Sequence, residues 1–222
     1  MILGIDTSLG TAVAVVEPDG AVRAEAHSAN PLGHAEVIGT LIAQVLRDAE
    51  RGPIGATAAP APAAPTHVAA GMGPGPFTGL RVGIAAARAF ALARGIPVIP
   101  VPSHDAAALA LLLADPFADL PRFAVVTDAR RRELAYTVYD GIDGDGLPVR
   151  ATEPALSPLA DLDARLAGLG AERRDVSGIP AAMLALAAAR AVAAGRTLAD
   201  GEPLYLRAPD VTLPGAPKRV TG

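Results

Sequence analysis

Apolar and polar positions at the start of the chain follow a short-period pattern that predicts strands. Apolar runs cover residues 2–5 and 12–16, and a third, mixed run covers residues 21–27. Asp19 and Gly20, between the second and third runs, form a dipeptide that is typical of tight hairpin turns. We therefore expect the chain to open with three consecutive antiparallel strands.

The next segment, residues 33–50, changes to a helical period. Ile38, Leu41, Ile42 and Val45 recur at spacings of three and four, which places them on one face of a helix. This apolar face is wider than the surface that a helix needs for packing against one face of a sheet. We therefore expect part of it to be available for a second contact.

Residues 66–101 predict a strand, a glycine-rich turn, a helix and a second strand. Four glycines and two prolines fall within residues 71–79, so neither a helix nor a strand ladder can continue through them. Thr78 is the expected N-cap of a helix over residues 80–94, which a glycine and a proline then end. A second apolar run, residues 96–101, completes a parallel crossover whose turn faces an anion or a close backbone neighbour.

The second half of the chain repeats the pattern of the first. A helix is predicted to begin near residue 103, residues 122–127 and 133–139 predict a hairpin, and residues 147–152 predict a third strand. A final helix is expected over residues 180–194. This repetition favours an α/β protein built from a duplicated domain.

Composition narrows the functional classes. The 222 residues carry a net charge of −4 with a pI near 5.5, which argues against an autonomous nucleic-acid binder. The absence of cysteine excludes disulfides, thiol catalysis and zinc-thiolate sites. The start of the chain lacks a basic region, and Arg88 and Arg190 interrupt the longest apolar stretches. We therefore expect a cytoplasmic protein with no signal peptide and no membrane span.

Two loops supply candidate residues for contacting nucleotide phosphates: the end of the first strand and the glycine-rich turn. These residues are Asp6, Thr7, Ser8, Gly73, Gly75, Thr78 and Gly79. The turn is neither a P-loop nor a dinucleotide-binding motif, because it lacks the lysine–hydroxyl pair of the first and the spacing of the second. The alternative is structural: Asp6 and Ser8 cap a turn, and the glycines only permit close packing.

Residues 73–83 read G-P-G-P-F-T-G-L-R-V-G and resemble the G-P-G-S-F-T-G-[LV]-R-[IV]-G signature of the TsaB family. These bacterial proteins are needed to make threonylcarbamoyladenosine in tRNA. Residues 128–136, D-A-R-R-R-E-L-A-Y, and residues 203–207, P-L-Y-L-R, are also similar to the family's pattern. The opening I-D-T-S resembles the first phosphate loop of the actin, Hsp70 and sugar-kinase superfamily, although that loop usually has a glycine after the aspartate.

The resemblance implies two tandem ribonuclease-H-like domains of the actin, Hsp70 and sugar-kinase type, with mixed sheets flanked by helices. We expect an N-terminal domain over residues 1–103 and a smaller, reduced domain over residues 104–222. Only a charged stretch, residues 168–178, stands where the family has a further strand. Composition predicts a mobile Pro/Ala-rich loop over residues 52–65 and a flexible tail over residues 208–222.

The start of the second domain bears on metal binding. The paralogous catalytic family, TsaD, has I-P-V-H-H-M-E-G-H where this chain has residues 99–107, and its two metal positions correspond to Ser103 and Ala107. His104 lies one residue out of register, about 100° around a helix from the ligand position. We therefore expect no metal site.

The resemblance then implies a non-catalytic scaffold or activator subunit with no independent activity and no catalytic residue. TsaD would transfer the threonylcarbamoyl group to the tRNA adenosine beside the anticodon, in complex with this chain and the ATPase TsaE. The tRNA would be reached only through the complex, no cofactor would be bound tightly, and ATP or ADP would be held at the partner interface. In isolation the chain could form a homodimer instead.

The expected interface, with the partner or with a second copy, combines the first helix with the crossover helix. Its residues are His34, Ile38, Leu41, Ile42, Val45, Gly83, Ala86, Ala87 and Phe90.

The predicted hairpin of the second half carries Asp128, Arg130 and Glu133. These three could form a catalytic constellation, but charges at a hairpin tip more often pair with one another in water. Residues 130–132 are the main basic cluster, a candidate for tRNA or partner contact. The alternative function is a small-molecule kinase or ATPase that uses Asp6 and the glycine-rich turn.

Overall fold

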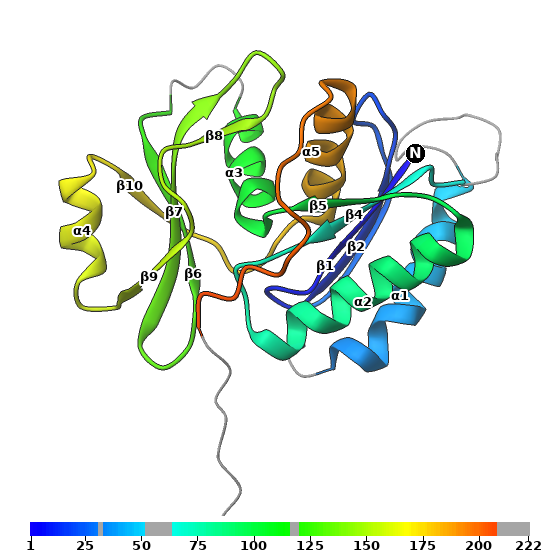
Figure 1. The fold of residues 1–222 in the computed structure, drawn as a ribbon, viewed down its shortest axis with the longest axis horizontal. Helices are drawn as coiled ribbons and strands as arrows, with labels where there is room; N and C mark the ends of the chain where they lie inside the picture. The colour runs from blue at the N-terminus through cyan, green and yellow to red at the C-terminus, as the bar shows by residue number, and fades with distance from the viewer. Residues whose placement is uncertain (31–32, 52–63, 116–119, 208–222) are drawn as a thin grey trace, which may run out of the picture.

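The computed structural model describes residues 1–30, 33–51, 64–115 and 120–207. It contains two mixed sheets with helices between them and on their outer faces (Figure 1). This arrangement confirms the predicted α/β class. Most of the loop expected over residues 52–65 and the whole tail expected over residues 208–222 lie outside the described residues.

The first sheet has the order β3-β2-β1-β4-β5. Its antiparallel part, predicted from the short-period pattern, consists of β1 (Ile2–Asp6), β2 (Thr11–Val16) and β3 (Val22–Ser28). The other two strands, β4 (His67–Gly71) and β5 (Val98–Val101), run parallel to β1. The crossover from β4 to β5 therefore has the predicted parallel form.

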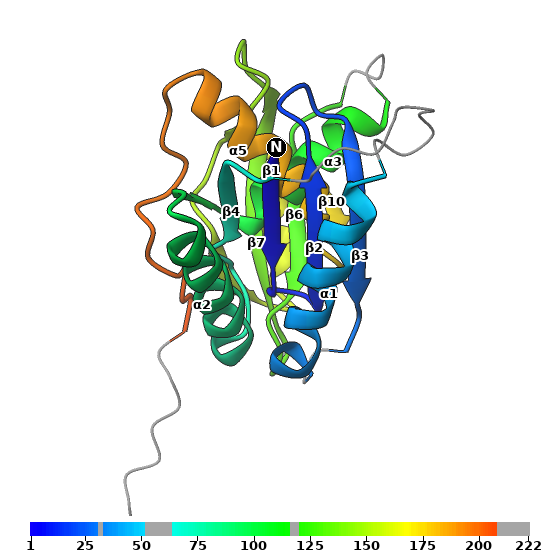
Figure 2. The ribbon, with the colours of Figure 1, turned by 90° about the vertical axis from the view of Figure 1, so that its right-hand side faces the viewer.

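Helices cover both faces of the first sheet. The helices α1 (His34–Ala49) and α2 (Phe77–Arg94) lie next to each other on one face (Figure 2). The alanine-rich α5 (Ala181–Ala193) covers the other face. It lies so close to β1 that a Cβ atom at Gly4 would stand 2.4 Å from the carbonyl oxygen of Ala181, so this strand position requires glycine.

The second sheet has the order β10-β6-β7-β8, with β9 also paired to β7. Its strands are β6 (Phe123–Asp128), β7 (Glu133–Ile142), β8 (Pro148–Arg150), β9 (Ala155–Pro158) and β10 (Glu172–Asp175). The short helix α4 (Leu162–Gly168) packs beside β10.

The charged stretch between residues 168 and 178 therefore does supply a strand. The four residues of β10 carry no apolar side chain, which is why their pattern did not predict one. They pair with β6 through the backbone, and ion pairs link Arg173 to Asp163 and Asp175. A charged edge strand also resists pairing with another chain.

A shared helical layer joins the two sheets. The helix α3 (Ser103–Ala114) packs against α5, and both lie between the sheets (Figure 1). One core cluster includes Val101 of the first sheet, Phe123 and Tyr139 of the second, and buried residues of both helices. Although we expected α5 to belong to the C-terminal half, it packs on the N-terminal sheet, and the halves share one core. No helix of the described residues combines the length and apolarity that a membrane span requires.

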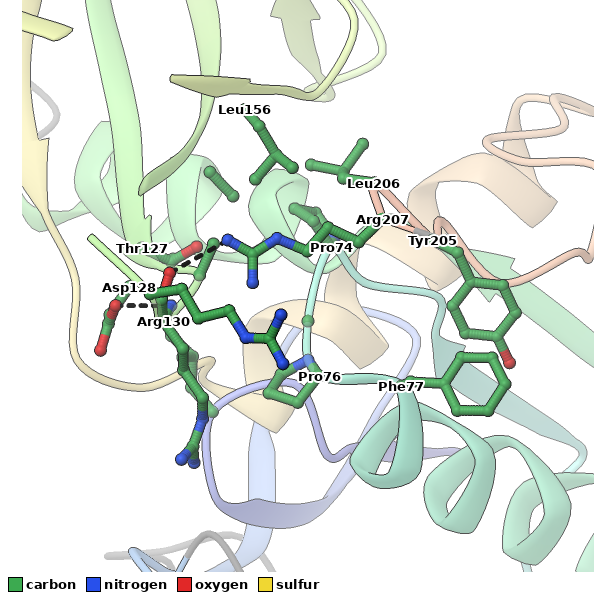
Figure 3. Close-up of a pocket in the computed structure, with 15 residues that line it drawn as sticks. Pro74, Pro76, Phe77, Thr127, Asp128, Arg130, Leu156, Tyr205, Leu206 and Arg207 are labelled. Atoms are coloured by element: carbon green, nitrogen blue, oxygen red, sulfur yellow. Dashed lines mark hydrogen bonds between the residues drawn. The ribbon is translucent and has the colours of Figure 1, made fainter. Parts of the chain in front are cut away.

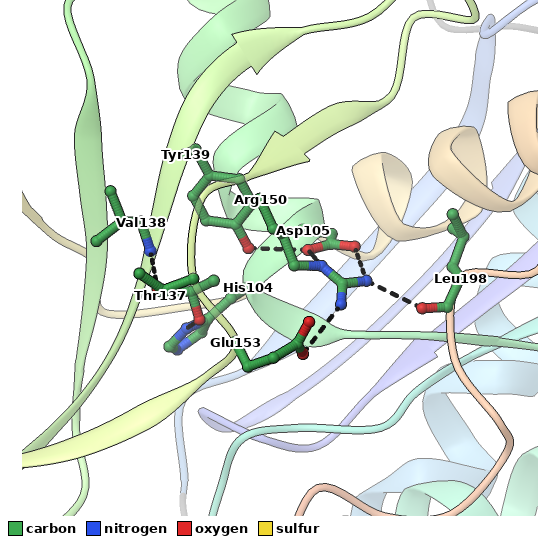
Figure 4. A network of polar contacts seen from close by, with 9 residues as sticks. His104, Asp105, Thr137, Val138, Tyr139, Arg150, Glu153 and Leu198 are labelled. Carbon is green, nitrogen blue, oxygen red and sulfur yellow. Dashed lines mark hydrogen bonds and ion pairs between the residues drawn. The ribbon is translucent and has the colours of Figure 1, made fainter.

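A buried ion pair ties α3 to the second sheet (Figure 4). The carboxylate of Asp105 accepts two hydrogen bonds from the Arg150 guanidinium, both of 2.9 Å, and one of 2.8 Å from the Tyr139 hydroxyl. Arg150 also donates to the carbonyl oxygen of Leu198, 2.9 Å away, in the segment after α5. This network links α3, β7, β8 and residues 194–207, which follow α5 and which we call the C-terminal segment.

We expect Arg150→Leu to lower the free energy of unfolding by about 3 kcal/mol, because it leaves the Asp105 carboxylate buried without its partner. Urea unfolding followed by circular dichroism would measure the change. Arg122→Leu is the matched control, since the Arg122–Asp140 pair is exposed and such pairs contribute about 0–1 kcal/mol. Equal losses in the two variants would contradict this account of the network.

Candidate functional site

The predicted phosphate loops meet at the edge where the parallel strands β1, β4 and β5 end. Asp6 is the last residue of β1, the glycine-rich turn begins at the end of β4, and Ser103 begins α3 just after β5. Parallel strands place their carboxyl ends at one edge, and this edge is where α/β proteins generally bind ligands. The structure thus brings together the two loops that the sequence singled out.

The Asp6 carboxylate is buried and its oxygens are occupied by the protein itself. It accepts hydrogen bonds from the backbone N–H of Ser8 at 2.7 Å and from the hydroxyls of Ser103 at 2.5 Å and Ser8 at 3.1 Å. The Ser103 hydroxyl oxygen in turn accepts a hydrogen bond of 3.0 Å from the backbone N–H of Gly73. Burial raises the pKa of Asp6, against the opposing effect of these hydrogen bonds.

Ser103 is the partner that the sequence did not reveal. The sequence indicates only that Ser103 aligns with a metal position of TsaD, because its hydrogen bonds to Asp6 and Gly73 depend on the tertiary fold.

The glycines of the turn allow it to pack directly on the first loop. A Cβ atom at Gly71 would stand 1.9 Å from Asp6 Oδ2, one at Gly75 would stand 2.8 Å from the Cα of Ser8, and one at Gly79 would stand 2.7 Å from the carbonyl oxygen of Thr7. The Thr7 hydroxyl also donates to the carbonyl oxygen of Gly79 at 2.7 Å. These contacts favour the structural alternative, in which the glycines permit close packing, over a phosphate cradle.

The prediction of Thr78 as the N-cap of the crossover helix is wrong. The helix α2 begins at Phe77, and its N-cap is Pro76, which has extended backbone angles and makes no side-chain hydrogen bond. The carbonyl oxygen of Pro76 accepts the first helical bond, from Leu80 N at 3.0 Å. The fixed φ of proline suits this entry, and Thr78 is left exposed.

Two hollows lie where the loops of the first sheet face the β6–β7 hairpin. We call the smaller one, of about 290 Å³, the hairpin cavity; residues 74–77, 127–131 and 205–207 form most of its wall (Figure 3). We call the larger one, of about 750 Å³, the wide cleft; it lies between the β1–β2 loop, β3 and the loop before α5. Pro76, Asp128 and Arg130 border both hollows.

Acidic groups dominate the wide cleft. Glu25, Asp128 and Asp175 line it, and Arg130 is the one lysine or arginine among the described residues around it. Glu25 also accepts a hydrogen bond of 3.2 Å from the backbone N–H of Ala182 at the N-terminus of α5. A helix N-terminus commonly binds an anion, and here a carboxylate of the chain takes that place. Because Arg173 neutralises Asp175, a small excess of negative charge remains, from Glu25 and Asp128 against Arg130, and this excess opposes binding of a nucleotide triphosphate.

We expected the side chains of Asp128, Arg130 and Glu133 to pair with one another, and this expectation is wrong. Glu133 forms its ion pair with Arg207 of the C-terminal segment. Asp128 Oδ1 accepts a hydrogen bond of 2.7 Å from the backbone N–H of Arg130. Arg130, Arg131 and Arg132 have φ angles of 64°, 55° and 61°, a left-handed conformation that is rare for three successive residues with side chains.

The C-terminal segment, whose role the sequence did not reveal, spans both halves. Leu204 N donates to the carbonyl oxygen of Met72 at 2.7 Å. The Tyr205 ring lies beside that of Phe77 (Figure 3), with their centroids 4.6 Å apart. Arg207 then reaches the hairpin. This segment forms one wall of the hairpin cavity.

The predicted interface residues lie mostly inside the chain. His34, Ile38, Val45, Gly83 and Ala87 are buried, so the prediction that they form a contact surface is wrong for these five. His34 Nδ1 and the Thr11 hydroxyl are hydrogen-bonded at 2.9 Å. The remaining four are half-buried against the same core: Leu41, Ile42, Ala86 and Phe90. The exposed faces of α1 and α2 therefore carry other residues.

The residues that align with the metal positions of TsaD, and His104 beside them, are buried in the core. Ser103 and Ala107 are buried, and both ring nitrogens of His104 lie within hydrogen-bond distance of hydroxyls, Thr137 at 2.8 Å and Thr127 at 3.0 Å. Burial lowers the pKa of His104 to about 3, so its ring is neutral. The described residues contain no group of three or more His, Cys, Asp or Glu side chains that could hold a metal ion.

We expect Gly83→Ala to destabilise the protein by about 2 kcal/mol, because its Cβ atom would stand 2.2 Å from Thr7 Oγ1 in a tightly packed site. Gly39→Ala is the matched control in α1, where a Cβ atom meets no atom within 4 Å. There the better helix propensity of alanine should stabilise by up to about 1 kcal/mol. Thermal unfolding of the two variants would test the contrast, and a stabilising Gly83→Ala would contradict the packing described.

We expect the wild-type protein to lose stability relative to His104→Gln as the pH falls. Below the unfolded pKa of about 6.5 the unfolded chain binds a proton at His104, whereas the folded chain does so only near pH 3. The difference between the two free energies of unfolding should therefore change by about 1.4 kcal/mol per pH unit within this window. Urea unfolding between pH 4.5 and 7.5 would measure it, and a constant difference would rule out a neutral buried ring.

Known proteins resemble this chain in both sequence and structure. A family model described as TsaD, tRNA N6-adenosine threonylcarbamoyltransferase, matches residues 30–190. An uncharacterised protein of Mycobacterium tuberculosis H37Rv is 40% identical over 151 residues, which cover 64% of each chain. A tRNA N6-adenosine threonylcarbamoyltransferase of Bordetella petrii is 36% identical over 103 residues, covering 46% of this chain and 29% of the enzyme. The chain thus matches less than two thirds of the length of these relatives.

Among solved structures, YeaZ of Pseudomonas aeruginosa aligns with a TM-score of 0.66 and 26% identity, over 92% of this chain and 99% of YeaZ. Another structure from that organism, of an uncharacterised protein with similarity to the peptidase YeaZ, gives a TM-score of 0.67 at 26% identity, over 93% and 99% of the two chains. These matches confirm the fold and the resemblance that residues 73–83 indicated. The chain belongs to the TsaD family and is a TsaB-type, YeaZ-like member of it, with the fold of the actin-like ATPase superfamily.

Proposed function

We propose that this chain is a non-catalytic subunit in the biosynthesis of threonylcarbamoyladenosine in tRNA. It forms a complex with TsaD, which carries out the transfer, and with the ATPase TsaE. The tRNA reaches the chain only through this complex. The chain binds no cofactor tightly by itself, and ATP or ADP is held at the interface with the partner.

The hydrogen bonding of Asp6 is the observation that carries this proposal. A working ATPase of this superfamily needs the aspartate of its first loop free to face phosphates and a metal ion. Here the Asp6 oxygens accept hydrogen bonds from Ser8 and Ser103, and the glycine-rich turn closes over them. The acidic lining of the wide cleft adds an electrostatic argument in the same direction.

The outward faces of α1 and α2 are suited to hold the partner. Gly39 and Ala43 are exposed on α1, and Ala85, Ala89 and Leu92 are exposed on α2. Leu92, in the last turn of α2, is 85% exposed, which is a large exposure for an apolar side chain of this size. Small side chains allow another helix to approach closely, so the same surface serves a homodimer when the partner is absent.

Analytical ultracentrifugation of the chain mixed with TsaD of the same organism would test the proposal. We expect a heterodimer whose affinity falls by about tenfold or more in Ala89→Arg and Leu92→Glu, because each places a charge in the contact. Ala167→Arg, at an exposed alanine of α4 far from α1 and α2, is the control and should bind as the wild type does.

Two results would overturn the proposal. One is no association with TsaD, whether or not TsaE and ATP are added. The other is sustained ATP turnover by the isolated chain that Asp6→Asn abolishes, which would support the kinase or ATPase alternative.

A further inference from the structure

The hairpin cavity has mostly apolar walls drawn from both halves of the chain. Pro74 and Pro76 come from the loops of the first half, Leu156 from β9, and Leu206 from the C-terminal segment (Figure 3). Concave sites with apolar walls and a few polar groups are the usual form of small-molecule binding sites. At about 290 Å³, this cavity holds on the order of ten to fifteen non-hydrogen atoms at normal packing density.

Charged side chains interrupt these apolar walls. Arg130, Arg131 and Arg207 lie in the wall together with Asp128, and Glu133 is paired to Arg207.

Arg130 is the group that can meet a ligand's charge. The ion pairs found among the described residues include none to its guanidinium, whereas Arg207 is neutralised by Glu133. Three hydrogen bonds fix the backbone of Arg130. Its own N–H donates to Asp128, and its carbonyl oxygen accepts from the Glu133 N–H at 3.0 Å and from the Arg207 guanidinium at 3.1 Å. The left-handed turn thus holds the base of this side chain at the border of the cavity although its φ of 64° is unfavourable.

We propose that the hairpin cavity binds a small monocarboxylate with an apolar body. A guanidinium matches the planar geometry of a carboxylate, with two parallel hydrogen bonds. One guanidinium, that of Arg130, suits a monoanion, while Asp128 in the same wall repels a phosphate dianion. The apolar walls receive the rest of the molecule. This site is separate from the partner surface on α1 and α2.

Benzoate is a suitable probe, because it joins one carboxylate to an apolar ring within the available volume. In titrations of the full chain followed by methyl and amide NMR spectra, we expect a dissociation constant on the order of 1 mM. The shifted signals should include the methyl groups of Leu156 and Leu206. Benzamide, the neutral isostere, and inorganic phosphate should shift neither.

Arg130→Gln should weaken benzoate binding by about tenfold or more, since it removes the charged hydrogen bonds. Arg132→Gln is the matched control, in the same turn with a φ of 61° but outside the cavity wall, and should bind benzoate as the wild type does. The proposal is overturned if benzoate shifts neither leucine, if benzamide or phosphate binds equally well, or if the two variants lose affinity alike. These measurements use the chain alone, so their failure leaves the partner association untouched.

Discussion

The hydrogen bonds of the Asp6 carboxylate hold together the edge at which the rest of the site is built. A buried carboxylate is costly unless its oxygens are satisfied, and here Ser8 and Ser103 satisfy them from two different segments. This requirement fixes the first loop, the glycine-rich turn and the start of α3 relative to one another. The first loop and the glycine-rich turn thus support each other directly in this chain.

The shared core extends that rigidity to the whole molecule. Because α3 and α5 pack between the two sheets, the halves do not have separate cores that could move apart easily. The Asp105–Arg150 pair and the C-terminal segment add polar links across the same junction. The outward faces of α1 and α2 and the hairpin cavity are therefore presented in a fixed relation, which suits a subunit that works by binding.

Sequence patterns predicted the fold better than the site. The strands of the first half, the parallel crossover and the hairpin followed from periodicity and from turn residues. Periodicity could not show which part of a wide apolar helix face meets the sheet, so Ile38 and Val45 were expected at an interface although they are core residues. The strand β10 could not be predicted from its all-charged composition, because its formation depends on backbone hydrogen bonds to β6. The Glu133–Arg207 pair joins residues far apart in sequence, and only the fold brings them together.

The close contacts of the glycine-rich turn have a consequence for how such a signature is interpreted. At Gly71, Gly75, Gly79 and Gly83, any side chain would collide with residues 6–8, whether or not a nucleotide is present. Steric selection alone would then preserve the motif in a descendant that has abandoned the ancestral chemistry. A motif search that finds it identifies a shared ancestry and architecture, and a pseudoenzyme passes that search as readily as an active enzyme does.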